Sequence, residues 1–260
     1  MAFYIFDVDG VLTDEHARPS EEVLHIIEKL YKQNEQLAFI TGRSRQWLAE
    51  NIFTSLSEDL DWSSLYCVAE HGAIKGKGPD IHTWQLDPDF VIPDKVKDEL
   101  YKISKKREYK GLIEWDDTKE SMGTVESVHG DPGDEEHLEK TRKALKAYSE
   151  EAKEVADKNN KKVVTSTYGV DVVPPDLSKK VGVQWVVDQV SLNDNPVNVF
   201  GDSQGDFIMA ETARQYHAED VTFFWVGDGD PPETEDDQIT IKSSSESFAG
   251  GTREILKSLL

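Results

Sequence analysis

The sequence predicts an α/β protein whose core is a parallel sheet and which carries an inserted α+β domain. Three observations support this prediction. Short β-branched or aromatic runs alternate with helical apolar patterns in the first and last parts of the chain. The middle, from about residue 76 to 174, breaks that alternation. Polar and acidic residues directly follow several of the predicted core strands, where ligands of parallel sheets bind.

The first elements alternate regularly between strand and helix. In the segment SEEVLHIIEKLYK, Val23, Ile26 and Leu30 share one helical face, and Ser20 precedes them as a plausible N-cap. Strands separated by helices pair in parallel, because the chain must cross back before the next strand begins. The predicted elements are strand 3–6, helix 20–32, strand 36–41, helix 44–53 and strand 64–69.

The middle of the chain has a different composition of elements. The pair Tyr168-Gly169 separates the last two strands and indicates a hairpin. The predicted elements are helix 94–106, strands 111–115 and 124–128, helix 135–157, and strands 162–167 and 170–173. We therefore predict a core made of residues 1–76 and 175–260, interrupted by a smaller domain at 77–174.

The alternating pattern returns after residue 175. The acidic stretch GDGDPPETEDD at 227–237 is typical of a solvated loop. The predicted elements are helix 179–190, strand 196–200, helix 205–216, strand 221–226 and a terminal helix from Thr252.

Charge and composition restrict the function classes. The chain has 51 acidic against 29 basic residues, a formal charge of −22, which argues against nucleic-acid partners and anionic membranes. Such a surface also suits a salty cytoplasm. The single cysteine, Cys67, rules out an internal disulfide, and no apolar stretch reaches the ~18 residues of a membrane span. We expect a cytoplasmic protein; its oligomeric state is not indicated.

Four places after predicted strands or at a helix start hold polar side chains. Taken singly, each has an ordinary explanation as a turn, a helix cap or a solvated lysine. Together they suggest a site at the carboxyl edge of the sheet. The residues are Asp7 and Asp9; Thr41, Gly42 and Arg43; Lys179; and Asp202, Ser203 and Asp206.

The chemistry of these groups fits phosphoryl transfer. Asp7, Asp202 and Asp206 offer the hard oxygen ligands that Mg²⁺ prefers. A hydroxyl and an ammonium, from Thr41 and Lys179, suit the remaining oxygens of a phosphoryl group. An aspartate beside such a metal can attack phosphorus and form an aspartyl-phosphate, so Asp7 can be the nucleophile.

The chain resembles phosphatases of the haloacid dehalogenase superfamily. Four motifs occur in the order found there: FDVDGVLTD, FITGR, the lysine of LSKKVG, and FGDSQGD followed by FIMAE. The resemblance covers roughly residues 1–76 and 175–260, and it implies a Rossmann-like core. The inserted middle resembles the α/β cap domain that one branch of this superfamily places between its second and third motifs and that determines substrate specificity.

The resemblance also implies roles for individual residues. Asp7 would be the nucleophile and a Mg²⁺ ligand, and Asp9 would be the general acid and then the general base, with its backbone carbonyl on the metal. Thr41, Gly42 and Lys179 would hold the phosphoryl group. Asp202 would bind Mg²⁺, and Asp206 would do so directly or through water while holding Lys179.

Two features of the motifs depart from the usual pattern. Gly205 stands where many relatives have Asn, which puts one hydrogen bond in doubt. Lys180 is adjacent to Lys179, and we choose Lys179 because the spacing K-x-x-G-V fits the lysine-led helix better; Lys180 is the alternative. Arg43, Ser203 and His71 are further candidates.

Two stretches suggest a sugar phosphate as the substrate. AEHGA, with His71, resembles a segment of sugar-phosphate phosphatases, and LIEWDDTKESMG, with Glu114 and Lys119, is loosely similar to the cap of trehalose-6-phosphate phosphatases. An ordinary turn and a solvated loop are the alternatives. We expect a Mg²⁺-dependent phosphomonoesterase acting on a small sugar phosphate, with trehalose 6-phosphate favoured. The competing functions are a phosphomutase of the phosphomannomutase type, a phosphatase for phosphoglycolate or another small metabolite, and a non-catalytic binding protein.

Overall fold

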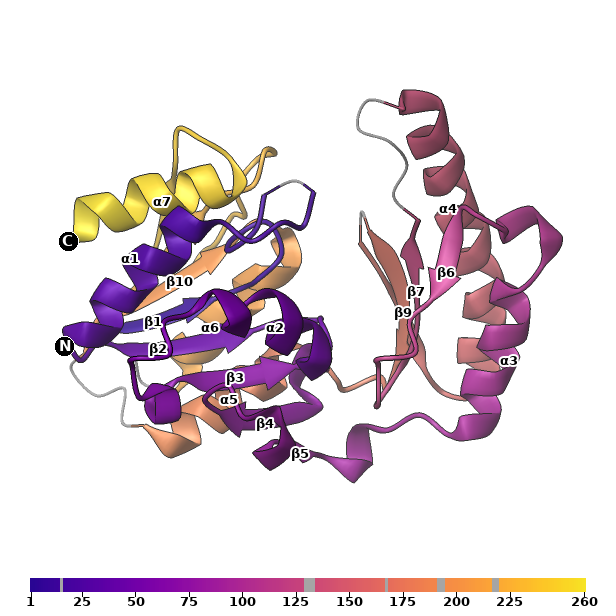
Figure 1. The fold of residues 1–260 in the computed structure, drawn as a ribbon, viewed down its shortest axis with the longest axis horizontal. Helices are drawn as coiled ribbons and strands as arrows, with labels where there is room; N and C mark the ends of the chain where they lie inside the picture. The colour runs from indigo at the N-terminus through magenta and orange to yellow at the C-terminus, as the bar shows by residue number, and fades with distance from the viewer. Residues whose placement is uncertain (15, 129–133, 167, 191–194, 217–219) are drawn as a thin grey trace. The chain divides into compact units, whose positions relative to one another are not determined.

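The chain folds into two compact units. The computed structural model describes residues 1–260 except 15, 129–133, 167, 191–194 and 217–219 (Figure 1). Unit 1 comprises Met1–Gln85 and Ser178–Leu260, and unit 2 comprises Leu86–Leu177. None of the helices in the described part of the chain combines the length and the apolar character needed to cross a membrane.

Unit 1 is built on an eight-stranded sheet in the order β12-β11-β10-β1-β2-β3-β4-β5. The pairs from β12 to β3 are parallel, and β4 runs antiparallel to β3. This confirms the predicted α/β class and the mostly parallel sheet. The strands are β1 (Phe3–Phe6), β2 (Gln36–Ile40), β3 (Tyr66–Ala69), β4 (Ile74–Lys77), β5 (Gln85–Leu86), β10 (Val197–Gly201), β11 (Val221–Trp225) and β12 (Ile239–Ser243).

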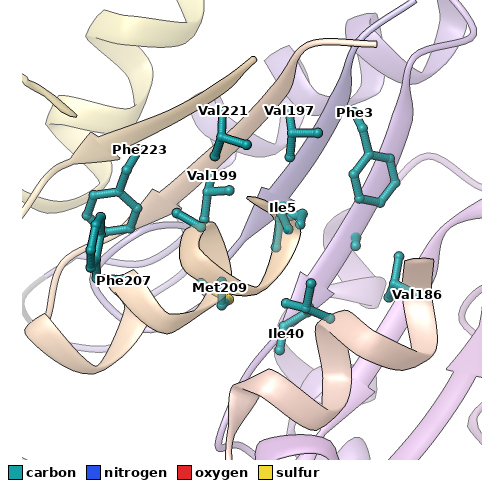
Figure 2. Packing of buried hydrophobic residues seen from close by; sticks show 14 of the residues in the cluster. Phe3, Ile5, Ile40, Val186, Val197, Val199, Phe207, Met209, Val221 and Phe223 are labelled. Carbon is teal, nitrogen blue, oxygen red and sulfur yellow. The ribbon is translucent and has the colours of Figure 1, made fainter. Parts of the chain in front are cut away.

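Helices of unit 1 cover the sheet and bury its apolar side chains. Alternate residues of the strands, among them Phe3, Ile5 and Phe223, pack with Val186 of α5 and Met209 of α6 (Figure 2). Full burial of side chains of this size stabilises the fold by about 1.5–3 kcal/mol each. On the same unit, α1 packs against α7. The helices are α1 (Glu21–Lys32), α2 (Arg45–Asn51), α5 (Lys179–Gln189), α6 (Phe207–Gln215) and α7 (Phe248–Leu259).

Three strands and one helix start differ from the sequence-based prediction. β4, β5 and β12 were not predicted, and α7 begins at Phe248 rather than Thr252. Two consecutive glycines, Gly250 and Gly251, are typical of a loop, but a Cβ at Gly251 would lie 2.4 Å from the backbone carbonyl oxygen of Glu246, so the helix needs glycine there. Because β4 and β5 extend the large sheet, unit 1 continues to Gln85, beyond the predicted boundary at residue 76.

Unit 2 is an antiparallel sheet in the order β6-β7-β9-β8, packed against two helices. Its core includes Leu100 of α3 and Tyr148 of α4 together with Val125 and Val170 of the strands. The elements are α3 (Asp94–Ser104), β6 (Ile113–Trp115), β7 (Gly123–Ser127), α4 (Glu135–Lys158), β8 (Lys162–Thr165) and β9 (Gly169–Val173). Thr167, the last residue of the predicted strand 162–167, lies outside the described residues.

The face of this sheet opposite α3 and α4 carries three acidic residues, Glu114, Glu126 and Asp171, together with Lys162 of β8. Strand alternation directs Ile113 and Val125 into the helix-side core and therefore Glu114 and Glu126 to the other face. Glu114 and Glu126 are directly paired across β6 and β7, and Asp171 of β9 accepts a hydrogen bond of 2.6 Å from the Thr124 hydroxyl. Two carboxylates therefore stand side by side on this face of the sheet.

Candidate active site

The predicted site residues of unit 1 gather at the carboxyl edge of the parallel sheet. Asp7 follows β1, and its backbone N–H donates to Phe200 O, while Thr41 follows β2 and its N–H donates to Val68 O. These bonds continue the strand ladder one residue beyond each strand, which fixes the direction of both residues. Asp202 follows β10, and Lys179 is the first residue of α5.

Three carboxylates form a cluster at this edge. Asp7, Asp202 and Asp206 each place an oxygen within 4.8 Å of the others, and Asp7 and Asp206 are almost completely buried. The loop after β1 comes so close that a Cβ at Gly10 would lie 2.1 Å from Asp202 Oδ2. Gly10 also has φ of +69°, so glycine is required both for its backbone conformation and for this approach.

The Lys179 side chain places an ammonium group against this carboxylate cluster. Its Nζ lies 2.6 Å from Asp7 Oδ1 and 2.5 Å from Asp206 Oδ1. The other oxygen of Asp206 accepts hydrogen bonds from Ser203 Oγ at 2.7 Å and from the backbone N–H groups of Asp202 and Ser203. Asp206 is therefore held on both oxygens, and Ser203 acts as the cap that orients it.

The charges of the cluster are unbalanced, because three carboxylates share one ammonium. Burial and the neighbouring Asp206 raise the pKa of Asp7 to about 7, although Lys179 opposes this. Burial together with Asp7 and Asp206 raises the pKa of Asp202 to about 8. For Asp206, burial also favours the neutral form, but the contact with Lys179 outweighs it and lowers the pKa. Burial disfavours the charged form of Lys179, yet Asp206 and Asp7 raise its pKa above the usual value.

These properties fit a divalent cation. The donors are hard oxygens from three side chains, and a bound cation would offset the burial and the carboxylate repulsion that raise the pKa values of Asp7 and Asp202. Mg²⁺ commonly takes few carboxylates and completes its shell with water and phosphate oxygens. Asp7, Asp202 and Asp206 are thus the residues that would hold it.

Backbone hydrogen bonds from the loop after β3 hold the loop after β2 in place. Glu70 N–H donates to Arg43 O, and His71 N–H donates to Thr41 O. Glu70 and His71 both have positive φ, of 50° and 56°, which is rare for residues with a side chain. The His71 ring lies against Gly42, where a Cβ would be 2.6 Å from the imidazole. His71 and Gly42 are therefore neighbours at the site, and glycine is needed at position 42.

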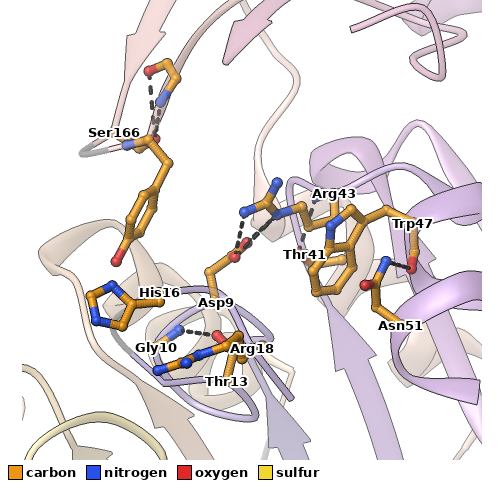
Figure 3. A network of polar contacts seen from close by, with 12 residues as sticks. Asp9, Gly10, Thr13, His16, Arg18, Thr41, Arg43, Trp47, Asn51 and Ser166 are labelled. Atoms are coloured by element: carbon orange, nitrogen blue, oxygen red, sulfur yellow. Dashed lines mark hydrogen bonds and ion pairs between the residues drawn. The ribbon is translucent and has the colours of Figure 1, made fainter. Parts of the chain in front are cut away.

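Asp9 is paired with Arg43 (Figure 3). The guanidinium Nε lies 2.9 Å from Asp9 Oδ2, and Nη2 lies 2.8 Å from Oδ1. Arg43 in turn stacks over the Trp47 ring, 4.8 Å from its centroid. Trp47 is not among the residues predicted for the site; it lies in the first turn of α2, four residues after Arg43, which precedes the N-cap Ser44, and this spacing is the signal that points to it.

The two candidate residues of unit 2 have different surroundings. Glu114 is exposed on the sheet face opposite α3 and α4. Lys119 is mostly buried and lines a cavity of about 520 Å³ together with Asp94, Tyr101 and Trp115. Lys180 is partly exposed at the second position of α5, next to the lysine that contacts the carboxylates.

Comparison with known proteins adds a family assignment and several similar folds. The family model described as haloacid dehalogenase-like hydrolase matches residues 4–216. No curated protein sequence matches the chain significantly.

Solved structures match the whole chain at low sequence identity. A protein of Thermoplasma acidophilum has 17% identity and a TM-score of 0.64, over 99% of this chain and 97% of that one. The trehalose-6-phosphate phosphatase of Aspergillus fumigatus has 21% identity and a TM-score of 0.52, over 100% and 93%. The sucrose-phosphatase of Synechocystis, solved with sucrose and phosphate, has 17% identity and a TM-score of 0.58, over 99% and 97%. These likenesses establish a shared fold.

Proposed function

Since the chain belongs to the haloacid dehalogenase-like hydrolase family, we propose that it is a Mg²⁺-dependent phosphomonoesterase acting on a small sugar phosphate. The observation that supports this most directly is the cluster of Asp7, Asp202 and Asp206 around the Lys179 ammonium. A buried nucleophile beside one fixed cation and a divalent-metal donor set suits attack on an anionic phosphate. A cytoplasmic location stays a prediction from the sequence.

The proposed reaction has two steps. An oxygen of Asp7 attacks phosphorus, the bond to the ester oxygen breaks, and Asp9 gives its proton to the leaving alcohol. Asp9 then takes a proton from water, whose oxygen attacks phosphorus and releases inorganic phosphate and free Asp7. Lys179 and the Thr41 hydroxyl would bind phosphoryl oxygens. Asp7, Asp202 and Asp206, together with the Asp9 backbone carbonyl, would hold a Mg²⁺, which would supply positive charge to offset the repulsion between nucleophile and phosphate.

We also propose that unit 2 is a cap that selects the leaving group. The sheet face that carries Glu114, Glu126 and Asp171 has carboxylate oxygens that can accept hydrogen bonds from sugar hydroxyls, and their excess over Lys162 on that face disfavours an anionic leaving group. Two proteins with the same fold are named as phosphatases of trehalose 6-phosphate and of a sucrose phosphate. Both points favour a neutral sugar, with trehalose 6-phosphate as the first candidate and Glu114 and Lys119 as its binding residues.

A panel of phosphate esters assayed with Mg²⁺ tests the substrate class. We expect kcat/KM for a hexose or disaccharide phosphate at least ~10-fold above that for nucleotides or phosphoglycolate, which corresponds to about 1.4 kcal/mol of discrimination. A preference for phosphoglycolate would contradict the sugar assignment while leaving the phosphatase assignment intact. A requirement for a sugar bisphosphate, with the phosphoryl group returned to the sugar, would identify a phosphomutase instead.

Replacing Glu114 with alanine separates sugar binding from the chemistry. We expect KM for the best sugar phosphate to rise several-fold, about 1 kcal/mol for one lost hydrogen bond, because a carboxylate acceptor for a hydroxyl is removed. Hydrolysis of p-nitrophenyl phosphate, which offers no sugar hydroxyls, should be nearly unchanged. Glu99→Ala is the matched control, since Glu99 is an exposed glutamate of α3 in the same unit. Equal losses on both substrates would argue against a sugar-binding role of Glu114.

A further inference from the structure

We propose that Arg43, supported by Trp47, is a positioning residue that orients the Asp9 carboxyl group for proton transfer to the leaving alcohol and from the attacking water. This rests on the proposed function, because it needs Asp9 to be the general acid and base. It assigns Arg43 to Asp9 rather than to the phosphoryl group.

The first support is the geometry of the contact. Arg43 uses Nε and Nη2 to engage both oxygens of Asp9, at 2.9 and 2.8 Å, in a side-on fork (Figure 3). Two parallel hydrogen bonds fix the plane of a carboxylate as well as its position, which one bond from an ammonium cannot do. The side chain of Asp9 is 26% exposed, so it remains accessible at its outer edge while Arg43 holds it.

The second support is that Arg43 is fixed independently of Asp9. Its guanidinium stacks on Trp47, a residue of α2 whose backbone N–H is capped by the Ser44 hydroxyl. Both backbone polar groups of Arg43 are hydrogen-bonded: its N–H donates to Thr41 Oγ1, and its carbonyl accepts from Glu70 N–H. The Arg43 side chain is only 9% exposed. Because the Arg43 guanidinium is rigid and buried, it imposes an orientation on the more exposed Asp9 carboxylate.

The positions of the two cations, Lys179 and Arg43, support the same assignment. Lys179 is the cation in direct contact with the nucleophile Asp7, whereas the fork of Arg43 is directed at the acid–base residue two positions later. Loss of Lys179 would therefore affect every substrate alike. Loss of Arg43 should matter most where the leaving group needs a proton.

Leaving-group dependence provides the test. We expect Arg43→Ala to lower kcat/KM for an alkyl phosphate by at least ~10-fold more than kcat/KM for p-nitrophenyl phosphate, because nitrophenolate leaves without protonation. Arg43→Lys should rescue little of this, since an ammonium cannot form the fork, and Trp47→Leu should show the same pattern with a smaller loss. Arg45→Ala is the control: Arg45 is close in sequence but bonds the carbonyls of Ile81 and Trp84, so both substrates should change equally.

A double-mutant cycle distinguishes action through Asp9 from direct contact with phosphate. In an Asp9→Asn background, Arg43→Ala should change kcat/KM for the alkyl phosphate by less than about three-fold. Additive losses, or equal losses on both leaving groups, would overturn the proposal and place Arg43 on the phosphoryl group.

A structural measurement keeps the proposal separate from the proposed function. In a crystal structure of Arg43→Ala, the Asp9 carboxyl group should be rotated or spread over several orientations. An Asp9 side chain unchanged in that variant would refute the positioning role whatever the enzyme hydrolyses. Failure of the wild-type protein to hydrolyse any ester would instead refute the phosphatase assignment.

Discussion

Asp7→Asn is expected to leave less than about a hundredth of wild-type activity with the fold intact. An amide is neither a nucleophile nor an anionic metal ligand. The loss of activity should therefore exceed ~10²-fold, which is the lower end of the ~10²–10⁴ range for a single acid–base group. Turnover of the best sugar phosphate measures it. Asp14→Asn is the control, because Asp14 belongs to the same loop region but pairs with the exposed Arg18. An Asp7→Asn protein retaining more than a hundredth of the activity would exclude Asp7 as the nucleophile.

The same substitution should stabilise the metal-free protein at alkaline pH. The pKa of Asp7 is raised from 3.8 to about 7, so its ionisation disfavours the folded state, and stability falls as pH rises through that window. Asparagine does not ionise and avoids this loss. Thermal melting with a chelator at pH 8.5 measures the difference; a change of ~1 kcal/mol would shift Tm by about 2–4 °C. A lower Tm for the variant would show that the Lys179 contact outweighs the repulsion.

Removal of Mg²⁺ is expected to abolish activity, and its return to restore it. The three clustered carboxylates cannot be brought together with an anionic phosphate unless their charge is offset. Activity after treatment with a chelator, followed by titration with Mg²⁺, measures this. Ca²⁺ should inhibit, since its larger and looser coordination sphere misplaces the nucleophile. Full turnover in metal-free buffer would contradict the metal assignment.

The affinity for Mg²⁺ should fall on acidification. Below about pH 7–8, protons occupy Asp7 and Asp202 in the metal-free protein and compete with the cation. The rise in Tm caused by a fixed Mg²⁺ concentration should therefore be larger at pH 8.5 than at pH 6. Asp14→Asn should leave that pH dependence unchanged, whereas Asp202→Asn should weaken it.

The central part of the fold could be predicted because its strands are strongly apolar and bounded by helices. FYIF and VTFFW become β1 and β11 at the predicted positions. β4, with the sequence IKGK, has no apolar alternation, and its Gly76 serves the packing of Trp84, which only the tertiary structure reveals. β12 alternates Ile239 and Ile241 with polar residues, but it follows an acidic loop and lies at the sheet edge, where the apolar signal is weak.

The gathering of the candidate residues at one sheet edge was predictable, but their individual contacts were not. The carboxylates after β1 and β10 meet because parallel strands end at the same edge, a consequence of topology alone. The pairing of Asp9 with Arg43 depends on side-chain directions in two loops, and no periodic pattern encodes these. The left-handed backbone at Glu70 and His71, both residues with side chains, was equally hidden, because such conformations are usually signalled by glycine or asparagine.

The position of β1 at the centre of the sheet has a consequence for synthesis of the protein on the ribosome. β1 pairs with β10, and Phe3 lies opposite Val197, so one flank of the first strand stays open until 194 further residues have been made. At roughly 5–20 residues per second this takes about 10–40 s. During this time the nascent chain exposes the unpaired apolar edge of β1, where mispairing can occur or chaperones can bind. Residues 86–177, in contrast, already contain all strands of their own sheet. The last segments to emerge therefore complete both the sheet and the carboxylate cluster.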